Sequence, residues 1–211
     1  SSWIMPSVTG RSSKAPQVRA FELRDPNGAE LPAVEPGSHL RFPVRLPSGD
    51  VVERHYSIAS NPERRDIYEI AVLREDAGSG GSAALHDSYA IGTRLRIDMP
   101  ANHFALHGDD RPALLIAGGI GITPMLSMLN WCHSQQPERE VWFFYGVRNS
   151  KETAFVAHLS AIAGAKPNVH LRLCFSDPTV RIQLKDQYQK IEHPRIMGMR
   201  VGNVGFLRNL S

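Results

Sequence analysis

The most informative segment of the chain is Ala113-Leu-Leu-Ile-Ala-Gly-Gly-Ile-Gly-Ile-Thr-Pro124. Its first five residues form a continuous apolar run, which is too short for a helix and suits a strand buried on both faces. A glycine-rich turn follows this run. From Thr123 to Gln135 the apolar residues recur at helical spacing. The segment therefore predicts a buried strand, a tight turn and a helix.

The residues that follow repeat this alternation. Val141–Tyr145 and Val169–Phe175 have the character of buried strands, and Ser150–Ala163 that of a helix between them. Strand, helix, strand, helix, strand predicts a parallel sheet with right-handed crossovers, in which ligands bind at the carboxyl ends of the strands. We therefore expect an α/β parallel-sheet domain over residues 111–211.

The part of the chain before this domain has a different character. Short alternating or β-rich runs are separated by turn residues, and one helix is predicted over Ser82–Tyr89. This spacing is typical of an antiparallel barrel or sandwich, so we expect an antiparallel β-barrel domain over residues 1–110. The predicted strands are Val18–Leu23, His39–Leu46, Val51–Ile58, Ile67–Arg74 and Arg94–Asp98.

Composition limits the class of protein. A chain of 211 residues with 42% apolar and 21% charged residues is long enough for one large globular domain or two small ones. No run of about 18 apolar residues appears, and Ser1–Gly10 lacks the pattern of a signal peptide. We therefore expect a soluble cytoplasmic protein that has no contact with a membrane.

Charge and cysteine content narrow the class further. The residues after Thr179 include six basic and two acidic side chains, a balance of +4 that leaves −1 for the rest of a chain whose net charge is +3. This distribution argues against a nucleic-acid surface in the body of the protein. Cys132 and Cys174 are too few for a zinc site or an iron–sulfur cluster, so we expect no metal and interpret both as core residues.

The first segment with possible chemistry is Arg54-His-Tyr-Ser57, on a predicted strand. Side chains alternate along a strand, so Arg54 and Tyr56 should face one side and Ser57 the other. A cation beside an aromatic ring can hold a phosphate and cover a flat ring system. The alternative is a surface arginine beside a tyrosine packed on the barrel.

The second segment is Gly78-Ser-Gly-Gly-Ser-Ala-Ala-Leu-His86, a glycine-rich turn that opens a helix, with Ser82 as the expected N-cap. Backbone N–H groups, the Ser82 hydroxyl and the helix dipole can together hold a phosphate there. A flexible loop with an ordinary cap is the alternative.

The third segment, Gly118–Pro124, lies where a parallel sheet binds its ligand. Its glycines would let a pyrophosphate approach the backbone, Thr123 can donate from its hydroxyl, and Pro124 suits a first helical turn. Its spacing is not G-x-G-x-x-G, so the spacing alone does not predict a dinucleotide site. A tight turn between strand and helix is the alternative.

These three segments in this order, followed by Tyr145-Gly146-x-Arg148, resemble the ferredoxin–NADP reductase superfamily. Gly80-Gly-Ser with the later Leu-His pair, and Pro100-Ala-Asn-His-Phe104, resemble the phthalate dioxygenase reductase branch. The resemblance covers about residues 10 to 178, and it is specific because four separate motifs agree in order and spacing.

The resemblance implies roles for individual residues. Arg54 would bind the phosphate of a flavin, Tyr56 would pack on its isoalloxazine ring, and Ser57 would be the catalytic residue near the reactive N5. Asn102 and Phe104 would lie near the same flavin, which is FMN in this branch and FAD in most of the superfamily. The residues implied at the flavin phosphate, besides Arg54, are Gly80, Gly81 and Ser82.

The resemblance also implies a nicotinamide dinucleotide on the parallel sheet, making residues 111–211 an NAD(P)-binding domain. Arg148 would lie near it, and the turn residues implied to hold it are Gly118, Gly119, Gly121, Thr123 and Pro124. Asp177 favours NADH over NADPH, because a carboxylate accepts a hydrogen bond from a ribose hydroxyl and repels a 2′-phosphate. The alternative is a turn or capping aspartate before Pro178.

The chain departs from the family pattern after the third strand of the sheet. The family continues with more helix and strand and a Cys-Gly-Pro motif that places a thiol near the nicotinamide, whereas residues 178–211 contain no such motif and no run typical of a buried strand. The branch also usually carries an iron–sulfur domain. We expect the sheet to lose strands on one side. Three explanations stay open: a truncated or frameshifted gene product, a lineage-specific tail that completes the sheet, or a fragment of a longer protein.

The sequence thus predicts a flavin-dependent oxidoreductase that passes electrons from NADH through bound flavin to a separate acceptor, such as an iron–sulfur protein or an oxygenase. The alternative is a catalytically incomplete flavin-binding module with a regulatory or partner-binding role.

Overall fold

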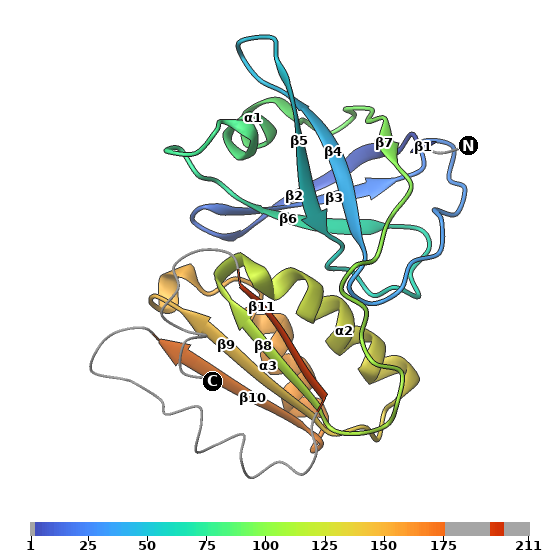
Figure 1. Ribbon diagram of the computed structural model, residues 1–211, viewed down its shortest axis with the longest axis vertical. Coiled ribbons are helices and arrows are strands. Elements are labelled where there is room, and N and C mark those ends of the chain that lie inside the picture. The colour runs from blue at the N-terminus through green and yellow to red at the C-terminus, as the bar shows by residue number, and fades with distance from the viewer. Residues whose placement is uncertain (1–2, 176–194, 201–211) are drawn as a thin grey trace. The chain divides into compact units, whose positions relative to one another are not determined.

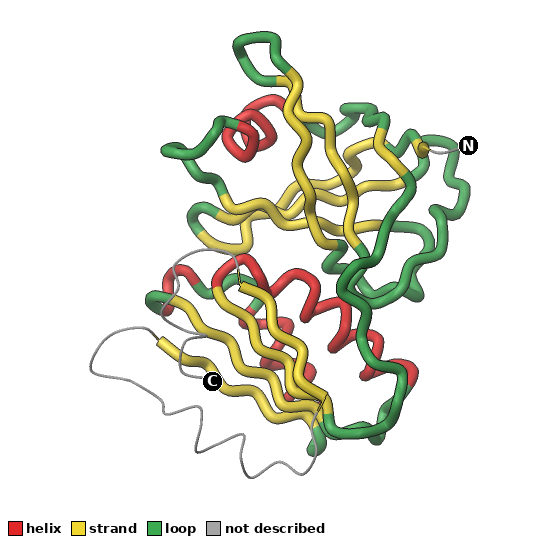
Figure 2. Tube along the Cα trace, viewed as in Figure 1, coloured by secondary structure: helices red, strands yellow, loops and turns green. Residues whose placement is uncertain are grey.

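The computed structural model describes residues 3–175 and 195–200, and the chain divides into two compact units, residues 1–105 and 106–211 (Figure 1). The expected boundary was at residue 110. The first unit consists mostly of strands and loops, and the second combines strands with helices (Figure 2). The strands pair antiparallel in the first unit and parallel in the second. The predicted fold class, a β-barrel followed by an α/β domain, is confirmed.

All the strand pairs of the first unit are antiparallel. They form a sheet in the order β2-β3-β6, a β4-β5 ribbon and a short β1-β7 pair. The elements are β1 (Trp3–Ile4), β2 (Ser7–Ala15), β3 (Val18–Arg24), β4 (His39–Arg45), β5 (Val51–Ser57), β6 (Tyr68–Leu73), α1 (Gly81–Ser88) and β7 (Ile97–Asp98).

Alternation of apolar and polar residues explains why these segments form strands around one core. In β4, Leu40, Phe42 and Val44 are buried, whereas Arg41 and Arg45 face solvent. One helix, α1, contributes to the same core. The fully buried side chains of this core include Phe21, Leu23, Ile58, Tyr68, Ile70, Leu85 and Ile97.

Strand β2 was not predicted. Val8 is the one buried side chain among its nine residues, so no alternating pattern marks it as a strand. It forms because it pairs along β3, with irregularities at Val8/Gly10 and Ser13/Ala15. The pairing of a polar segment with a neighbouring strand is a tertiary effect that local sequence does not encode.

The described part of the second unit is a four-stranded parallel sheet in the order β10-β9-β8-β11. The crossovers from β8 through α2 to β9, and from β9 through α3 to β10, step in the same direction, which places both helices on one face of the sheet (Figure 1). The elements are β8 (Ala113–Gly118), η1 (Gly119–Gly121), α2 (Ile122–Gln135), β9 (Val141–Val147), η2 (Ser150–Glu152), α3 (Val156–Ala165), β10 (Val169–Phe175) and β11 (Arg195–Arg200).

The predicted single helix over Ser150–Ala163 is wrong. A short 3₁₀ turn, η2, comes first, and α3 begins only at Val156. The side chain of Asn149 accepts hydrogen bonds from two backbone N–H groups of η2, and Phe155 adopts a left-handed conformation with φ of 62°. The apolar spacing predicts one helix, but the Asn149 cap and the left-handed conformation of Phe155 divide the segment into η2 and α3.

The expectation of no strand beyond residue 178 is also wrong. Strand β11 pairs in parallel with β8, with Ile196 opposite Leu114 and Met199 opposite Ala117. Residues 195–200 therefore add a strand to the described sheet, which agrees with a tail that completes the sheet and not with a loss of strands. Gly198 interrupts the apolar residues of this segment and an arginine stands at each end, which hides the strand from a search for buried runs.

Both cysteines are buried core residues, as predicted. Burial raises the pKa of each thiol, to about 11. Within residues 3–175 and 195–200, no helix is long and apolar enough to cross a membrane.

Candidate functional site

Strand β5 presents the predicted residues on two faces, as its period-two pattern implies. Tyr56 lies opposite Leu40 of β4 and Arg54 opposite Phe42. The ring of Tyr56 meets that of Phe42 edge to face, with 5.6 Å between the ring centroids. Burial raises the pKa of the Tyr56 phenol to about 12, so it remains neutral at physiological pH. Tyr56 is therefore a neutral ring held on one side by the barrel core.

Arg54 extends from β5 to the loop before α1. Its Nη1 donates to the carbonyl of Glu53 at 2.7 Å, and its Nη2 donates to the hydroxyl of Ser79. A Cβ placed on Gly81 would lie 2.7 Å from the Arg54 Nε, so a side chain at position 81 would fit only if the Arg54 side chain moved. The structure thus brings the first two predicted segments together, with a guanidinium against the backbone at the start of α1.

The first turn of α1 is arranged differently from the prediction. The helix begins at Gly81, and its N-cap is Gly80, which has a φ of 83°, rather than Ser82. A glycine suits this left-handed conformation because it has no Cβ. Ser82 lies inside the first turn, where its hydroxyl accepts a hydrogen bond from the N–H of Glu75 at 3.0 Å.

At the amino end of α1, Gly80 and Ser82 are partly exposed and Gly81 is buried. No side chain of the described residues caps the helix. The N–H groups of a first helical turn have no partner within the helix. With the guanidinium of Arg54 beside them, these N–H groups can bind a phosphate by charge and by hydrogen bonds. The half-buried ring of Tyr56, two residues from Arg54 on the same strand face, can cover a flat aromatic ring.

Asn102 and Phe104 lie in the segment after β7, which is attached to β4 by two backbone hydrogen bonds between His39 and Ala101. The side-chain amide of Asn102 donates to the carbonyl of Pro36 at 3.1 Å and its oxygen accepts from the N–H of Phe104 at 2.9 Å. Asn102 thus fixes the turn that carries Phe104.

Three histidines gather on the other face of the β4-β5 ribbon, the face of Ser57. The ring of His39 stacks on His55 at 5.2 Å and lies 5.3 Å from His103, between centroids. The Nε2 of His39 is buried and has no hydrogen-bond partner among the described residues. Burial, followed by the charges of His55 and His103, lowers the pKa of His39. The sequence did not single out His39, because these three residues come from separate segments.

The turn Gly118–Pro124 joins β8 to α2 at the carboxyl end of the strand. Gly119 is exposed and has a φ of 54°, and Gly121 is the N-cap of α2. The hydroxyl of Thr123 donates to the carbonyl of Ile120 at 3.1 Å, so its proton is used within the turn. Pro124 is buried in the first turn of α2. The exposed backbone at Gly119 and the amino end of α2 are the parts that can meet a phosphate.

Arg148 is exposed and follows β9 directly. Because β8 and β9 are parallel, their carboxyl ends meet at the same edge of the sheet. Tyr145 is buried, and burial raises its pKa to about 12. The second unit therefore places Arg148 and the 118–124 turn at one edge, whereas Asp177 lies outside the described residues.

Known proteins resemble this chain in sequence and in fold. The family model for the oxidoreductase NAD-binding domain matches residues 115–192. A vanillate O-demethylase oxidoreductase of Acinetobacter baylyi is 40% identical over 145 residues, which are 69% of this chain and 44% of the relative. The phthalate dioxygenase reductase of Burkholderia cepacia is 33% identical over 183 residues, which are 87% of this chain and 55% of the relative.

Solved structures agree. A phthalate dioxygenase reductase structure superimposes with a TM-score of 0.81 at 31% identity, covering 92% of this chain and 59% of that one. The flavohemoglobin of Malassezia yamatoensis, at 17% identity and a TM-score of 0.84, covers all of this chain and 55% of that one and shares the fold alone. The chain spans about half the length of the curated relatives it matches. It belongs to the ferredoxin–NADP reductase superfamily, in the phthalate dioxygenase reductase-like branch.

Proposed function

We propose that this chain is the flavin- and nicotinamide-binding part of a reductase that passes electrons from NADH through bound flavin to a separate acceptor. The observation that carries this proposal is the guanidinium of Arg54 lying against Gly81 at the amino end of α1, which no side chain of the described residues caps. Support also comes from a solved relative, the phthalate dioxygenase reductase, whose structure is described as modular for electron transfer from pyridine nucleotides to [2Fe-2S].

The flavin phosphate would be held at the amino end of α1. Arg54 supplies a fixed positive charge and the backbone of Gly80, Gly81 and Ser82 supplies N–H groups directed out of the helix. The Ser82 hydroxyl oxygen already accepts from Glu75, so its proton is free to point to a phosphate oxygen. The absence of a side chain at Gly81 keeps the approach open.

The flavin ring would lie beside Tyr56, whose phenol stays neutral and therefore does not repel an electron-rich reduced flavin. Ser57, Asn102 and Phe104 are proposed to lie near the same ring, with Ser57 close to N5. FMN is proposed over FAD because the branch uses FMN. Mass spectrometry of the cofactor released from the purified chain distinguishes the two.

The nicotinamide dinucleotide would bind at the carboxyl edge of the parallel sheet. Gly118, Gly119 and Gly121 allow a pyrophosphate to reach the backbone, and Arg148 adds a positive charge at that edge. Thr123 and Pro124 shape the turn through their buried positions in α2. The proposed preference for NADH rests on Asp177 in the sequence.

The bound flavin supplies the chemistry, since it can accept two electrons as a hydride and release them one at a time. The protein's residues hold the two cofactors and need not move a proton as an acid or base. The acceptor is proposed to be an iron–sulfur protein or an oxygenase. A Pseudomonas putida relative, 38% identical over 70% of this chain, is named as the reductase subunit of a phthalate 4,5-dioxygenase. A cytoplasmic location remains a prediction.

Flavin binding is tested with the purified chain and its Arg54→Glu variant. We expect the wild-type chain to bind FMN and the variant to retain none, because a carboxylate would face the phosphate. The matched control is Arg64→Gln, which removes an exposed arginine that pairs with Asp66 elsewhere on the barrel. Equal FMN occupancy in Arg54→Glu and wild type would contradict the assignment of Arg54.

A further inference from the structure

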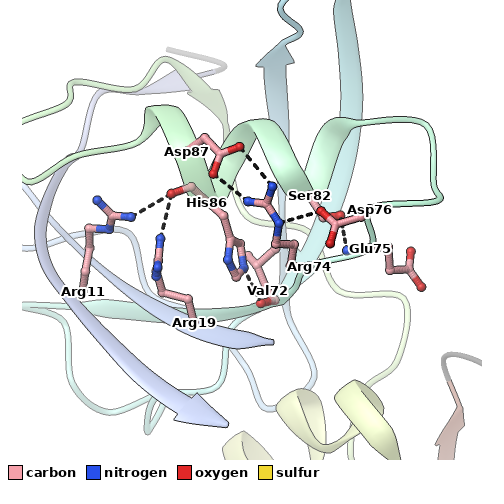
Figure 3. Close-up of polar contacts among 9 residues, drawn as sticks. All are labelled: Arg11, Arg19, Val72, Arg74, Glu75, Asp76, Ser82, His86 and Asp87. Carbon is pink, nitrogen blue, oxygen red and sulfur yellow. Dashed lines mark hydrogen bonds and ion pairs between the residues drawn. The ribbon is translucent and has the colours of Figure 1, made fainter. Parts of the chain in front are cut away.

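The carboxyl end of α1 is held by two arginines from neighbouring strands. Nη2 of Arg11, on β2, and Nη1 of Arg19, on β3, both donate to the backbone carbonyl of His86, at 2.8 and 2.7 Å (Figure 3). Two cations at one carbonyl suit the negative end of the helix dipole. No carboxylate among the described residues forms an ion pair with either arginine, so the helix end is their main polar partner.

The side chain of His86 makes a second attachment. Its Nε2 lies 2.8 Å from the carbonyl of Val72 on β6, and since a carbonyl can only accept, Nε2 carries the proton (Figure 3). The ring is buried and meets Phe21 edge to face, 6.2 Å between centroids. Burial lowers the pKa of His86, which keeps the ring neutral. The last turn of α1 is thus fixed to all three strands of the β2-β3-β6 sheet.

Arg74 makes the third attachment, between the loop that precedes α1 and the carboxyl end of α1. It follows β6, and its guanidinium binds Asp76 at 2.7 Å and both carboxylate oxygens of Asp87 at 2.6 and 3.2 Å (Figure 3). Asp87 lies in the last turn of α1, where the helix dipole disfavours a negative charge unless a cation pairs with it. Arg74 therefore connects Asp76, in the loop between β6 and α1, to the last turn of α1.

The helix needs these contacts to hold its direction. With eight residues it is too short to be stable alone, and at about 1.5 Å per residue it is roughly 12 Å long. Because so short a helix behaves as one rigid rod, contacts that fix its carboxyl end also fix the direction of the N–H groups in its first turn. At that first turn, a hydrogen bond from the Glu75 N–H to the Ser82 hydroxyl ties the loop to the helix.

We propose that Arg74 and Asp87, with Arg11 and Arg19 at the carbonyl of His86, are positioning residues that aim the first turn of α1 at a flavin phosphate. This inference rests on the proposed flavin function. None of the four side chains is proposed to touch the flavin. Their effect is transmitted along α1, and it concerns the phosphate end of the ligand rather than its ring.

A comparison of FMN with riboflavin isolates this effect, because riboflavin carries the same ring without the phosphate. Flavin-free wild-type chain and the variants Arg74→Gln and Asp87→Asn are titrated with each flavin, and binding is followed by flavin fluorescence. We expect each variant to bind FMN about 3- to 5-fold more weakly, the scale of a partly exposed ion pair, with riboflavin affinity unchanged. The double variant Arg11→Gln with Arg19→Gln should weaken FMN binding about 10-fold, because hydrogen bonds from charged groups are stronger.

Two further variants sharpen the test. Arg74→Lys keeps the charge but not the two-pronged geometry, so its FMN affinity should lie between those of wild type and Arg74→Gln. Arg64→Gln, which breaks a comparable Arg–Asp pair that has no contact with α1 or its loop, should leave both affinities unchanged.

The ratio of the FMN affinity to the riboflavin affinity distinguishes a positioning role from a role in stability alone. A lower FMN-to-riboflavin ratio in Arg74→Gln and Asp87→Asn supports the positioning role. An unchanged ratio, whether neither affinity falls or both fall together, shows that these residues serve stability alone and overturns the inference. If the wild-type chain binds neither flavin, the proposed function fails and the inference fails with it.

Discussion

The guanidinium of Arg54 lies so close to Gly81 that a Cβ on residue 81 would be 2.7 Å from the Arg54 Nε. The two residues come from a barrel strand and from the start of α1, and their approach creates the phosphate-binding geometry on which the functional proposal depends. It also gives a direct reason for a glycine at position 81.

Replacing Gly81 with alanine should therefore reduce flavin binding while leaving the fold intact. The new methyl group would meet the movable end of an arginine side chain, so Arg54 would shift instead of the backbone. We expect FMN affinity to fall about 10-fold or more, the scale of a lost charge-assisted hydrogen bond, and the melting temperature to change little. Fluorescence titration and thermal unfolding check the two parts.

The control for that variant is Gly108→Ala, since a Cβ on Gly108 would meet nothing within 4 Å. Wild-type FMN affinity in Gly81→Ala would show that Arg54 does not need its present position to bind flavin.

Tyr56 should affect the flavin ring rather than the phosphate. Tyr56→Ala removes a half-buried aromatic ring beside Phe42, so we expect FMN and riboflavin to lose affinity equally, and the fluorescence of bound flavin to increase for lack of a stacking partner. Tyr56→Phe keeps the ring and should restore both properties. A loss confined to FMN would place Tyr56 at the phosphate instead.

The histidines of the first unit should make its stability depend on pH. The pKa of His39 and of His86 lies below the usual value of 6.5 in the folded chain, so the unfolded chain binds more protons as the pH falls below 6.5. Stability is therefore full above pH 6.5 and decreases as the pH falls from there towards the lowered pKa values. Melting temperatures measured between pH 8 and pH 5 should show this decrease.

His39→Gln tests the contribution of the three-histidine cluster, because it removes the central ring from between His55 and His103. The decrease in melting temperature below pH 6.5 should become shallower in this variant. An identical pH profile would show that the cluster does not determine acid sensitivity.

Gly119 tests the second unit separately. Its φ of 54° is strained for other residues, and its exposed backbone is proposed to face a pyrophosphate. Gly119→Ala should cost about 1 kcal/mol of stability, because an L-residue with a Cβ is strained in the left-handed conformation. It should also slow the reduction of bound flavin by NADH, while FMN affinity stays at the wild-type value. Reduction at the wild-type rate would argue against a dinucleotide at this turn.

Much of the fold could be predicted because single segments carry strong patterns. The apolar run Ala113–Ala117 forms β8, where every one of those side chains is buried, and the alternation in His39–Arg45 forms β4. The segments without such patterns were missed. Strand β2 has one buried side chain, Phe155 breaks a helix through its backbone conformation, and β11 contains glycine and arginine.

The residues of the candidate site also divide into those that the sequence could predict and those that it could not. Arg54 and Tyr56 could be found because a strand places alternate residues on one face. Gly80 and Gly81 could be found because they precede the helix expected from Ser82. The contacts of Arg11 and Arg19 with His86 could not be found, because they join residues from distant parts of the chain through a backbone carbonyl. Side-chain identity gives no sign of such a bond.

The most direct test of the central claim is to mix the FMN-loaded chain with NADH without oxygen and to follow the flavin absorption band. The proposed function predicts that the band bleaches and that it returns when a one-electron acceptor is added. A chain that holds FMN which dithionite can bleach, but whose band NADH leaves unchanged, would contradict electron transfer from NADH to the flavin.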